Sequence, residues 1–143
     1  MKKIILFFIC IIIAICIISF GYNTYKLQKN AIIQENEEFE QYANKKIYGI
    51  DLATAINKAV DKNTKNDIEK DEKGFFIQNN ENSIEIEVKI QEEGEKYTLK
   101  MEQIHNKGTE QFVQYFINYI FNCTKIEYHE KTGKIKYMIF ENI

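Results

Sequence analysis

The sequence of 143 residues contains no arginine, no proline and no tryptophan. Every basic side chain is therefore a lysine, and the formal net charge is -2. Recognition of nucleic acids relies on bidentate guanidinium groups and on an excess of positive charge. A slightly acidic chain without arginine is therefore not expected to bind nucleic acid. Its richness in isoleucine, lysine and asparagine is typical of an AT-rich bacterial genome.

Residues that carry catalysis and metal binding are also scarce. Neither of the two histidines, His105 and His129, has a cysteine, serine or aspartate at a recognisable catalytic spacing. Cys123 and His129 are six residues apart, which on a strand separates them by about 20 Å. The sequence has no glycine-rich phosphate loop, no CxxC pair and no HExxH motif. We therefore expect no catalytic residues, no metal and no cofactor, and a protein that is not an enzyme.

One long apolar run lies at the N-terminus. Lys2 and Lys3 precede residues 4–20, which contain a single clearly polar side chain. As a helix this run is about 25 Å long, close to the hydrocarbon thickness of a bilayer, and two tyrosines follow it where an interfacial belt lies. The sequence predicts a transmembrane anchor over residues 1–21. Lysines before the run favour a cytoplasmic N-terminus, which places the rest of the chain outside the cytoplasm of a bacterial cell membrane.

A cleaved secretory signal peptide is the alternative, because the triplet SFG at residues 19–21 has the small-x-small outline of a cleavage site. In the anchor, Cys10 and Cys16 act as small apolar side chains, since neither follows the small residue that a lipoprotein signal requires. Cys123 is then the single cysteine of the exported part. We expect it to be a buried thiol on a strand, and an intermolecular disulfide is the alternative.

The residues after the anchor form a predicted stalk. No glycine or proline interrupts residues 22–46, and apolar side chains recur there at loosely helical spacing between charges. The membrane helix is expected to continue through this region. The stalk ends with two aromatic side chains, Phe39 and Tyr42, which we include among the candidates for a protein interface.

The remaining residues, 47–143, have the periodicities of a small α+β domain. An apolar stripe at i, i+3, i+4, i+7 and i+8 predicts a helix from about 51 to 62, and a second stripe predicts a helix over 109–121. Between and after them the apolar residues alternate with polar ones, as in strands with one buried face. The predicted strands are 75–77, 83–91, 97–101, 123–130 and 134–141. We expect an antiparallel sheet of about four to five strands with two packed helices.

Aromatic residues crowd the second predicted helix. If Phe112 and Phe116 face the core, Tyr115 and Tyr119 share a neighbouring face because they are four residues apart. Exposed paired tyrosines suit a protein interface, and partial burial at the margin of the core is the alternative. Tyr115 and Tyr119 are therefore the main candidate interface residues, for a protein partner or for a homo-oligomer.

An apolar helix that continues as a stalk and leads to a small antiparallel domain resembles the pilins and pseudopilins of bacterial pilus and secretion systems. The stretch FEQYANKKIYGIDLATAINKAVDKN resembles segments of small single-pass envelope proteins of low-GC Gram-positive bacteria. The points of contact are Phe39, Tyr42, Gly49, Asp51, Leu52, Ile56 and Asn63. A processed prepilin has a glycine before its apolar segment and a glutamate five residues into it, and this chain has neither. The resemblance therefore implies an unprocessed accessory subunit.

These observations predict a non-enzymatic, single-pass membrane protein whose extracytoplasmic domain makes protein contacts, as an accessory subunit of a secretion, pilus or envelope assembly. The alternative is a cell-surface module that binds or senses a ligand, which requires a concave apolar pocket between sheet and helix. A hydrolase is the third hypothesis.

Overall fold

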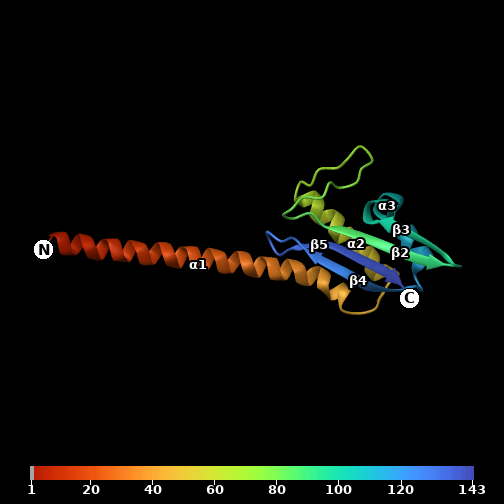
Figure 1. The fold of residues 1–143 in the computed structure, drawn as a ribbon, viewed down its shortest axis with the longest axis horizontal. Coiled ribbons are helices and arrows are strands. Elements are labelled where there is room, and N and C mark those ends of the chain that lie inside the picture. The colour runs from red at the N-terminus through yellow and green to blue at the C-terminus, as the bar shows by residue number, and fades with distance from the viewer. Residues whose placement is uncertain (1) are drawn as a thin grey trace. The chain divides into compact units, whose positions relative to one another are not determined.

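The computed structural model describes residues 2–143, and Figure 1 shows its helices and strands. In chain order they are α1 (Lys2–Ala43), β1 (Ile47–Tyr48), α2 (Gly49–Lys65), β2 (Glu85–Glu92), β3 (Glu95–Lys100), α3 (Met101–Lys107), α4 (Thr109–Phe116), β4 (Ile120–Tyr128) and β5 (Ile135–Asn142). The chain divides into a first unit that ends at Gln34 and a second unit, Glu35–Ile143. The second unit combines helices with a sheet, which confirms the predicted α+β class.

The first unit consists of α1 as far as Gln34 and includes the apolar run. Between Ile4 and Phe20 the large apolar side chains are exposed, and from Lys3 onward the helix is long and apolar enough to cross a membrane. Such a helix is compatible with a single-pass membrane protein, and a signal sequence near an N-terminus meets the same criteria. The helix continues without a break to Ala43, which confirms a helical segment after the apolar run.

The last turns of α1 belong to the folded second unit. Phe39 and Tyr42 are buried, with exposed fractions of 1% and 7%. The Glu35 carboxylate lies 3.3 Å from the Lys62 ammonium and 3.0 Å from that of Lys134. The second unit therefore begins at Glu35, well before the boundary at residue 47 that the composition predicts.

The five strands form one sheet in the order β1-β4-β5-β2-β3. Three of the four neighbouring pairs are antiparallel, so the sheet is mostly antiparallel as predicted, and one pair, β2 and β5, runs parallel. The reason is the connection through α3 and α4, which carries the chain from the end of β3 back across the sheet before β4 begins. The β4–β5 hairpin then pairs with the inner side of β2, and β3 remains at the edge.

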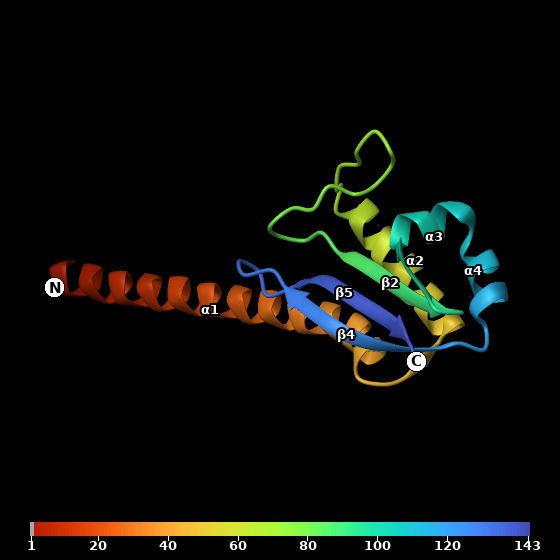
Figure 2. The ribbon, with the colours of Figure 1, turned by 45° about the vertical axis from the view of Figure 1, so that its right-hand side comes forward.

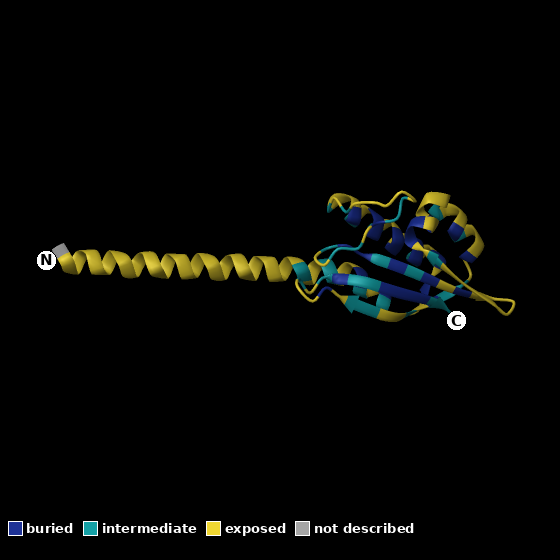
Figure 3. Ribbon diagram, turned by 45° about the horizontal axis from the view of Figure 1, so that its top comes forward, coloured by how far each residue is buried: buried dark blue, intermediate teal, exposed yellow. Residues whose placement is uncertain are grey.

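α2 lies against one face of this sheet, with α3 and α4 beside it on the same side (Figure 2). Side chains that alternate along the strands face these helices and are buried, and Figure 3 marks the buried positions on the ribbon. Ile86, Val88 and Ile90 of β2 and Met138 and Phe140 of β5 are all at most 1% exposed. The alternation predicted for residues 83–91 is therefore confirmed.

The opposite face of the sheet is charged, and no helix of the described part of the second unit lies against it. Glu85 and Glu87 of β2 point to this side, where the Lys100 ammonium lies 2.8 Å from Glu85 and the Tyr137 hydroxyl donates to Glu87 at 2.5 Å. Ile139 is buried on this face although it is outside the main core. Ion pairs and hydrogen bonds between neighbouring strands therefore organise the open face.

The helix predicted over residues 109–121 is too long. α4 ends at Phe116, and β4 begins at Ile120. The spacing of the apolar residues suits a helix, but Phe121 pairs with Ile47 on one side and Asn142 on the other. Its side chain is fully buried there, so pairing and packing within the sheet override the local helical pattern.

The strand predicted over residues 97–101 also ends earlier, because Met101 begins α3. The Lys100 N–H donates to Oε1 of Gln103 at 2.9 Å, which places a side-chain acceptor at the start of the helix. α3 is a third packed helix, beyond the two that the sequence predicts. Met101 and Ile104 are its buried apolar side chains. His105 consequently lies on α3. The predicted strand at 75–77 is reduced to an isolated bridge between Lys70 and Phe76.

Gly49 starts α2 at a point of close contact with α4. A Cβ atom at this position would lie 2.9 Å from the carbonyl carbon of Phe116, and closer still to its oxygen. Since backbone atoms cannot move aside as a flexible side chain can, the packing of α2 against α4 requires glycine.

We expect Gly49→Ala to lower the free energy of unfolding by about 1–3 kcal/mol, the usual cost of overpacking. Gly21→Ala is the matched control, because no atom lies within 4 Å of its added Cβ. Thermal unfolding of the full-length protein in detergent, followed by circular dichroism, measures both. Equal melting temperatures for the two variants would contradict the close contact.

Candidate functional site

Two of the four candidate interface residues are unavailable to a partner. Phe39 and Tyr42 lie in the core of the second unit, and the Lys58 ammonium is 5.6 Å from the centre of the Tyr42 ring. The aromatic end of the stalk therefore packs against its own domain. The interface predicted from the sequence does not extend to these two side chains.

Tyr115 and Tyr119 lie near each other but not on one helical face, because α4 ends between them. Tyr115 is 79% exposed, whereas Tyr119 is half-buried and its hydroxyl donates to Glu92. The Phe116 ring separates them, with its centre 6.5 Å from that of Tyr115 and 5.2 Å from that of Tyr119. Tyr115 is therefore the exposed member of the predicted pair.

Tyr115 borders a small apolar groove between β3, α3 and α4. The groove has a volume of about 240 Å³ and is open to solvent. The side chains that give it its apolar character are those of Leu99, Ile104, Phe112, Tyr115 and Phe116. Ligand pockets for small molecules usually hold about 300–1,000 Å³, so this apolar groove suits side chains of a protein better than a whole ligand.

Leu99, which lines the apolar groove, belongs to β3, and β3 is joined to β2 by a tight turn. Glu93 and Gly94 form its two-residue loop, with positive φ angles of 49° and 91°. In such a hairpin the pair that closes the loop exchanges both hydrogen bonds, and every second pair after it does the same. The backbone groups of Glu95, Tyr97 and Leu99 are thus directed to β2.

The intervening residues of β3 direct their backbone groups away from β2. These residues are Lys96, Thr98 and Lys100, and no described strand lies on that side of β3. The N–H of Lys100 is already bonded to Gln103. Lys96 and Thr98 therefore present two N–H and two C=O groups at a free sheet edge.

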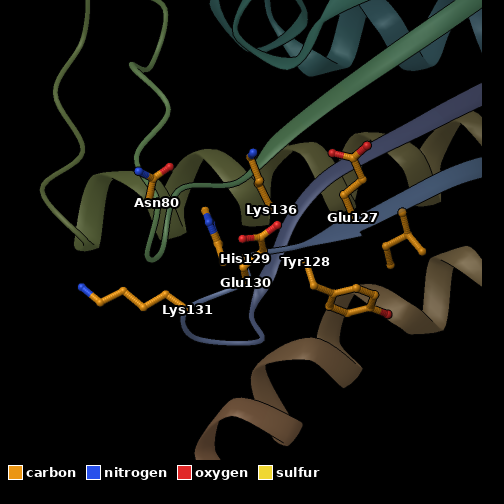
Figure 4. Close-up of a pocket in the computed structure, with 8 residues that line it drawn as sticks. Asn80, Glu127, Tyr128, His129, Glu130, Lys131 and Lys136 are labelled. Atoms are coloured by element: carbon orange, nitrogen blue, oxygen red, sulfur yellow. The ribbon is translucent and has the colours of Figure 1, made fainter.

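A second concave surface lies at the far end of the β4–β5 hairpin (Figure 4). This hairpin-end cleft has a volume of about 810 Å³. Figure 4 shows charged side chains of β4 and β5, such as Glu127 and Lys136, with Asn80 contributed by the loop before β2. Its lining is mainly polar, unlike that of the apolar groove.

Ion pairs determine the electrostatics around the hairpin-end cleft. The Lys131 ammonium bonds to Glu81, and this bond together with its charge lowers the pKa of the Glu81 carboxyl. The Lys125 ammonium, 2.6 Å from Glu127, lowers the pKa of that carboxyl in the same way. Within residues 2–143, no three His, Cys, Asp or Glu side chains are close enough to hold a metal ion.

His129 is buried where β4 leads into the turn of this hairpin. Its imidazole is 3% exposed, and Nε2 lies 2.8 Å from the Ser83 carbonyl oxygen. A carbonyl only accepts, so the Nε2 atom carries the proton. The Cys123 thiol has a different partner from His129, because its Sγ donates to the Lys125 carbonyl at 3.2 Å. The imidazole thus ties the β4–β5 hairpin to the segment before β2.

The two glutamates on the open face are bonded to neighbouring strands. The carboxylate of Glu87 accepts from Tyr137, and partial burial together with this bond raises the pKa of the tyrosine hydroxyl. The Lys100 ammonium donates a hydrogen bond to Glu85, and this bond raises the pKa of the ammonium. The two carboxylates thus have separate cationic or hydroxyl partners.

Glu102 is a buried carboxylate on α3. Its Oε1 accepts from the Phe76 N–H at 3.1 Å, whereas Oε2 has no hydrogen-bond partner among the described residues. The side chain holds the loop around Phe76 against the first turn of α3. None of the cavities described above reaches this carboxylate, so we assign it a structural role.

Comparison with protein-family models finds no match, and comparisons with curated proteins and with solved structures find no significant match either.

The sequence signals that point to the apolar groove and to the edge of β3 are local. They are the alternation of Lys96, Thr98 and Lys100 after a two-residue turn, and the exposed Tyr115.

Cys123 is half-buried on β4, as the sequence predicts for a strand thiol, and burial raises its pKa. We expect its thiol, in protein carrying Cys10→Ser and Cys16→Ser, to react with a maleimide near pH 7 at least about tenfold more slowly than free cysteine. The rate should rise with pH and should recover in denaturant. Native labelling as fast as that of free cysteine, or a Cys123-linked dimer on a non-reducing gel, would contradict this placement.

Proposed function

We propose that the chain is a non-enzymatic, single-pass membrane protein whose second unit lies outside the cytoplasm and makes protein contacts. The observation that carries the proposal is the double character of α1. Its apolar part is exposed over the length of a membrane span, and its last turns are built into the core of the second unit. Such an exposed apolar surface requires lipid or protein around it.

The free surface near β3 supports the second half of the proposal. Interface centres are enriched in tyrosine, phenylalanine and methionine, and Tyr115 stands exposed beside a groove with two phenylalanines. Leu99 of β3 lines the same groove, and the neighbouring residues Lys96 and Thr98 have open backbone groups at the sheet edge.

The resemblance to pilin-like envelope proteins extends the proposal to an accessory subunit of a secretion, pilus or envelope assembly. In such an assembly, the anchor holds the domain at the membrane while the exposed surface contacts a neighbouring protein. The anchor then limits the partner to proteins at the same membrane.

A cell-surface module that binds a ligand is the second candidate, and the hairpin-end cleft is the observation in its favour. Its volume of about 810 Å³ lies within the usual range for ligand sites. The cleft is polar and lies at the end of a hairpin, whereas the ligand-binding hypothesis requires an apolar pocket between sheet and helix. It therefore suits only a small polar ligand.

A photo-cross-linking amino acid in place of Tyr115 tests the proposal in full-length protein within its native membrane. We expect the chain to stay in the membrane pellet after an alkaline wash, to keep its mass of 17.0 kDa, and to form a protein adduct on irradiation. The matched control is the same amino acid at Asp61, an exposed position on α2. It should give no adduct, because Asp61 lies outside the groove.

A soluble product shortened by loss of residues 1–21 would contradict the membrane anchor. Equal adducts at Tyr115 and Asp61 would contradict the contact surface, since they would report only exposure. Turnover of a substrate that is abolished by a variant of Glu85, Glu87 or His129 would contradict a non-enzymatic function.

A further inference from the structure

We propose that β3 pairs with the β3 strand of a second copy of this chain, antiparallel and about a two-fold axis at Tyr97. The two sheets then become one continuous sheet. The inference rests on the proposed function in one respect, because it requires both copies to be anchored in the same membrane. It identifies a second copy of the chain as one protein that the second unit contacts.

The open backbone groups of β3 decide the register. Lys96 and Thr98 each offer one N–H and one C=O at the edge, while the N–H of Lys100 is taken by Gln103. In antiparallel pairing, two residues that face each other across the edge exchange both of their hydrogen bonds. All four open groups are used only when Lys96 of each copy lies opposite Thr98 of the other.

This register places the two Tyr97 residues directly opposite each other. They form a pair without backbone hydrogen bonds, in which the Cα atoms are about 4.5 Å apart and the side chains are close. Tyr97 is 39% exposed and faces the helix-covered side, so a second tyrosine ring can pack on it. Aromatic pairs across neighbouring strands are favourable contacts.

The antiparallel arrangement brings charges of opposite sign together at the two ends of the paired strands. Glu93 and Glu95 lie at the hairpin tip, and Lys100 lies at the other end of β3. In the proposed register, Gly94 of one copy is opposite Lys100 of the other. The acidic tip of each copy therefore meets the basic end of its partner. A parallel pairing would instead bring like charges together.

The lysines of the edge also explain why the contact needs a membrane. Lysine on an edge strand is a common defence against uncontrolled pairing, and a short strand pair buries far less than the roughly 1,000 Å² of a stable interface in solution. Anchoring both copies in one bilayer raises their effective concentration without any new contact. The pairing is therefore weak between detached domains and favoured between anchored ones.

Disulfide cross-linking of the full-length protein in its native membrane tests the register. In a chain with Cys10→Ser, Cys16→Ser and Cys123→Ser, we expect Tyr97→Cys to form a dimer of twice 17.0 kDa under mild oxidation. Lys100→Cys is the matched control on the same strand. The two Lys100 positions are about 20 Å apart in this register, far beyond disulfide reach. The Tyr97→Cys dimer should exceed the control at least about tenfold.

A second substitution separates edge pairing from random collision. Thr98→Pro removes an N–H that points away from β2, so it leaves the hairpin intact and blocks the added strand. We expect Tyr97→Cys with Thr98→Pro to lose the dimer at least about tenfold while its circular dichroism stays unchanged. A dimer that persists in this variant would overturn the proposal.

Other outcomes are equally decisive. Equal dimer from Tyr97→Cys and Lys100→Cys would overturn the register, and a disulfide adduct with a different protein would assign the edge to a foreign strand. Absence of dimer in a chain that remains in the membrane pellet would refute the pairing and leave the proposed function intact. Release of the chain from the pellet would refute the anchor itself.

Discussion

The parallel pairing of β2 with β5 is the interaction on which the rest of the second unit depends. It joins the β2–β3 hairpin to the β4–β5 hairpin, and without it the two hairpins would share no backbone hydrogen bonds. β5 thereby gains neighbours on both sides, and its Met138 and Phe140 side chains are completely buried. Because β5 lies on one side of β2, β3 lies on the other side and is the edge strand of the sheet. The free edge and the apolar groove beside it are therefore consequences of how the core is assembled.

A buried polar cluster before β2 fixes where this pairing begins. Asn63 of α2 uses its side-chain amide to bond both the N–H and the C=O of Ile84, each at 2.8 Å. His129 bonds the adjacent Ser83 carbonyl from the β4–β5 hairpin. Unpaired buried groups cost free energy, so these bonds favour a single register of β2. A helix and two hairpins are locked together at one point.

The sequence predicts much of the local structure because hairpins and amphipathic helices depend on neighbours along the chain. The strand around Ile86 and Val88 and the turn at Gly94 follow directly from alternation and turn chemistry. The end of α4 does not, because the position of Phe121 is decided by pairing with β1 and β5. Burial of His129 is equally non-local, since its partner lies 46 residues away.

The candidate site was predictable only in part, for the same reason. Tyr115 is exposed as its helical position suggests, but Phe39 and Tyr42 face a core that exists only once α1 meets the sheet. The edge character of β3 depends on the strand order, which the parallel pair determines. Local patterns thus identify exposed aromatic residues, whereas long-range pairing decides which of them border an open surface.

Hydrogen exchange of the full-length protein tests most directly whether the open edge of β3 is where the second unit makes contact. The comparison is between protein in its native membrane and monomeric protein in detergent. We expect the amides of Lys96 and Thr98 to exchange at least about tenfold more slowly in the membrane, because an added strand accepts a hydrogen bond from the N–H of each residue. Amides of the exposed loop that contains Asp71 should exchange equally in both. Equal exchange of Lys96 and Thr98 in membrane and detergent would contradict the account.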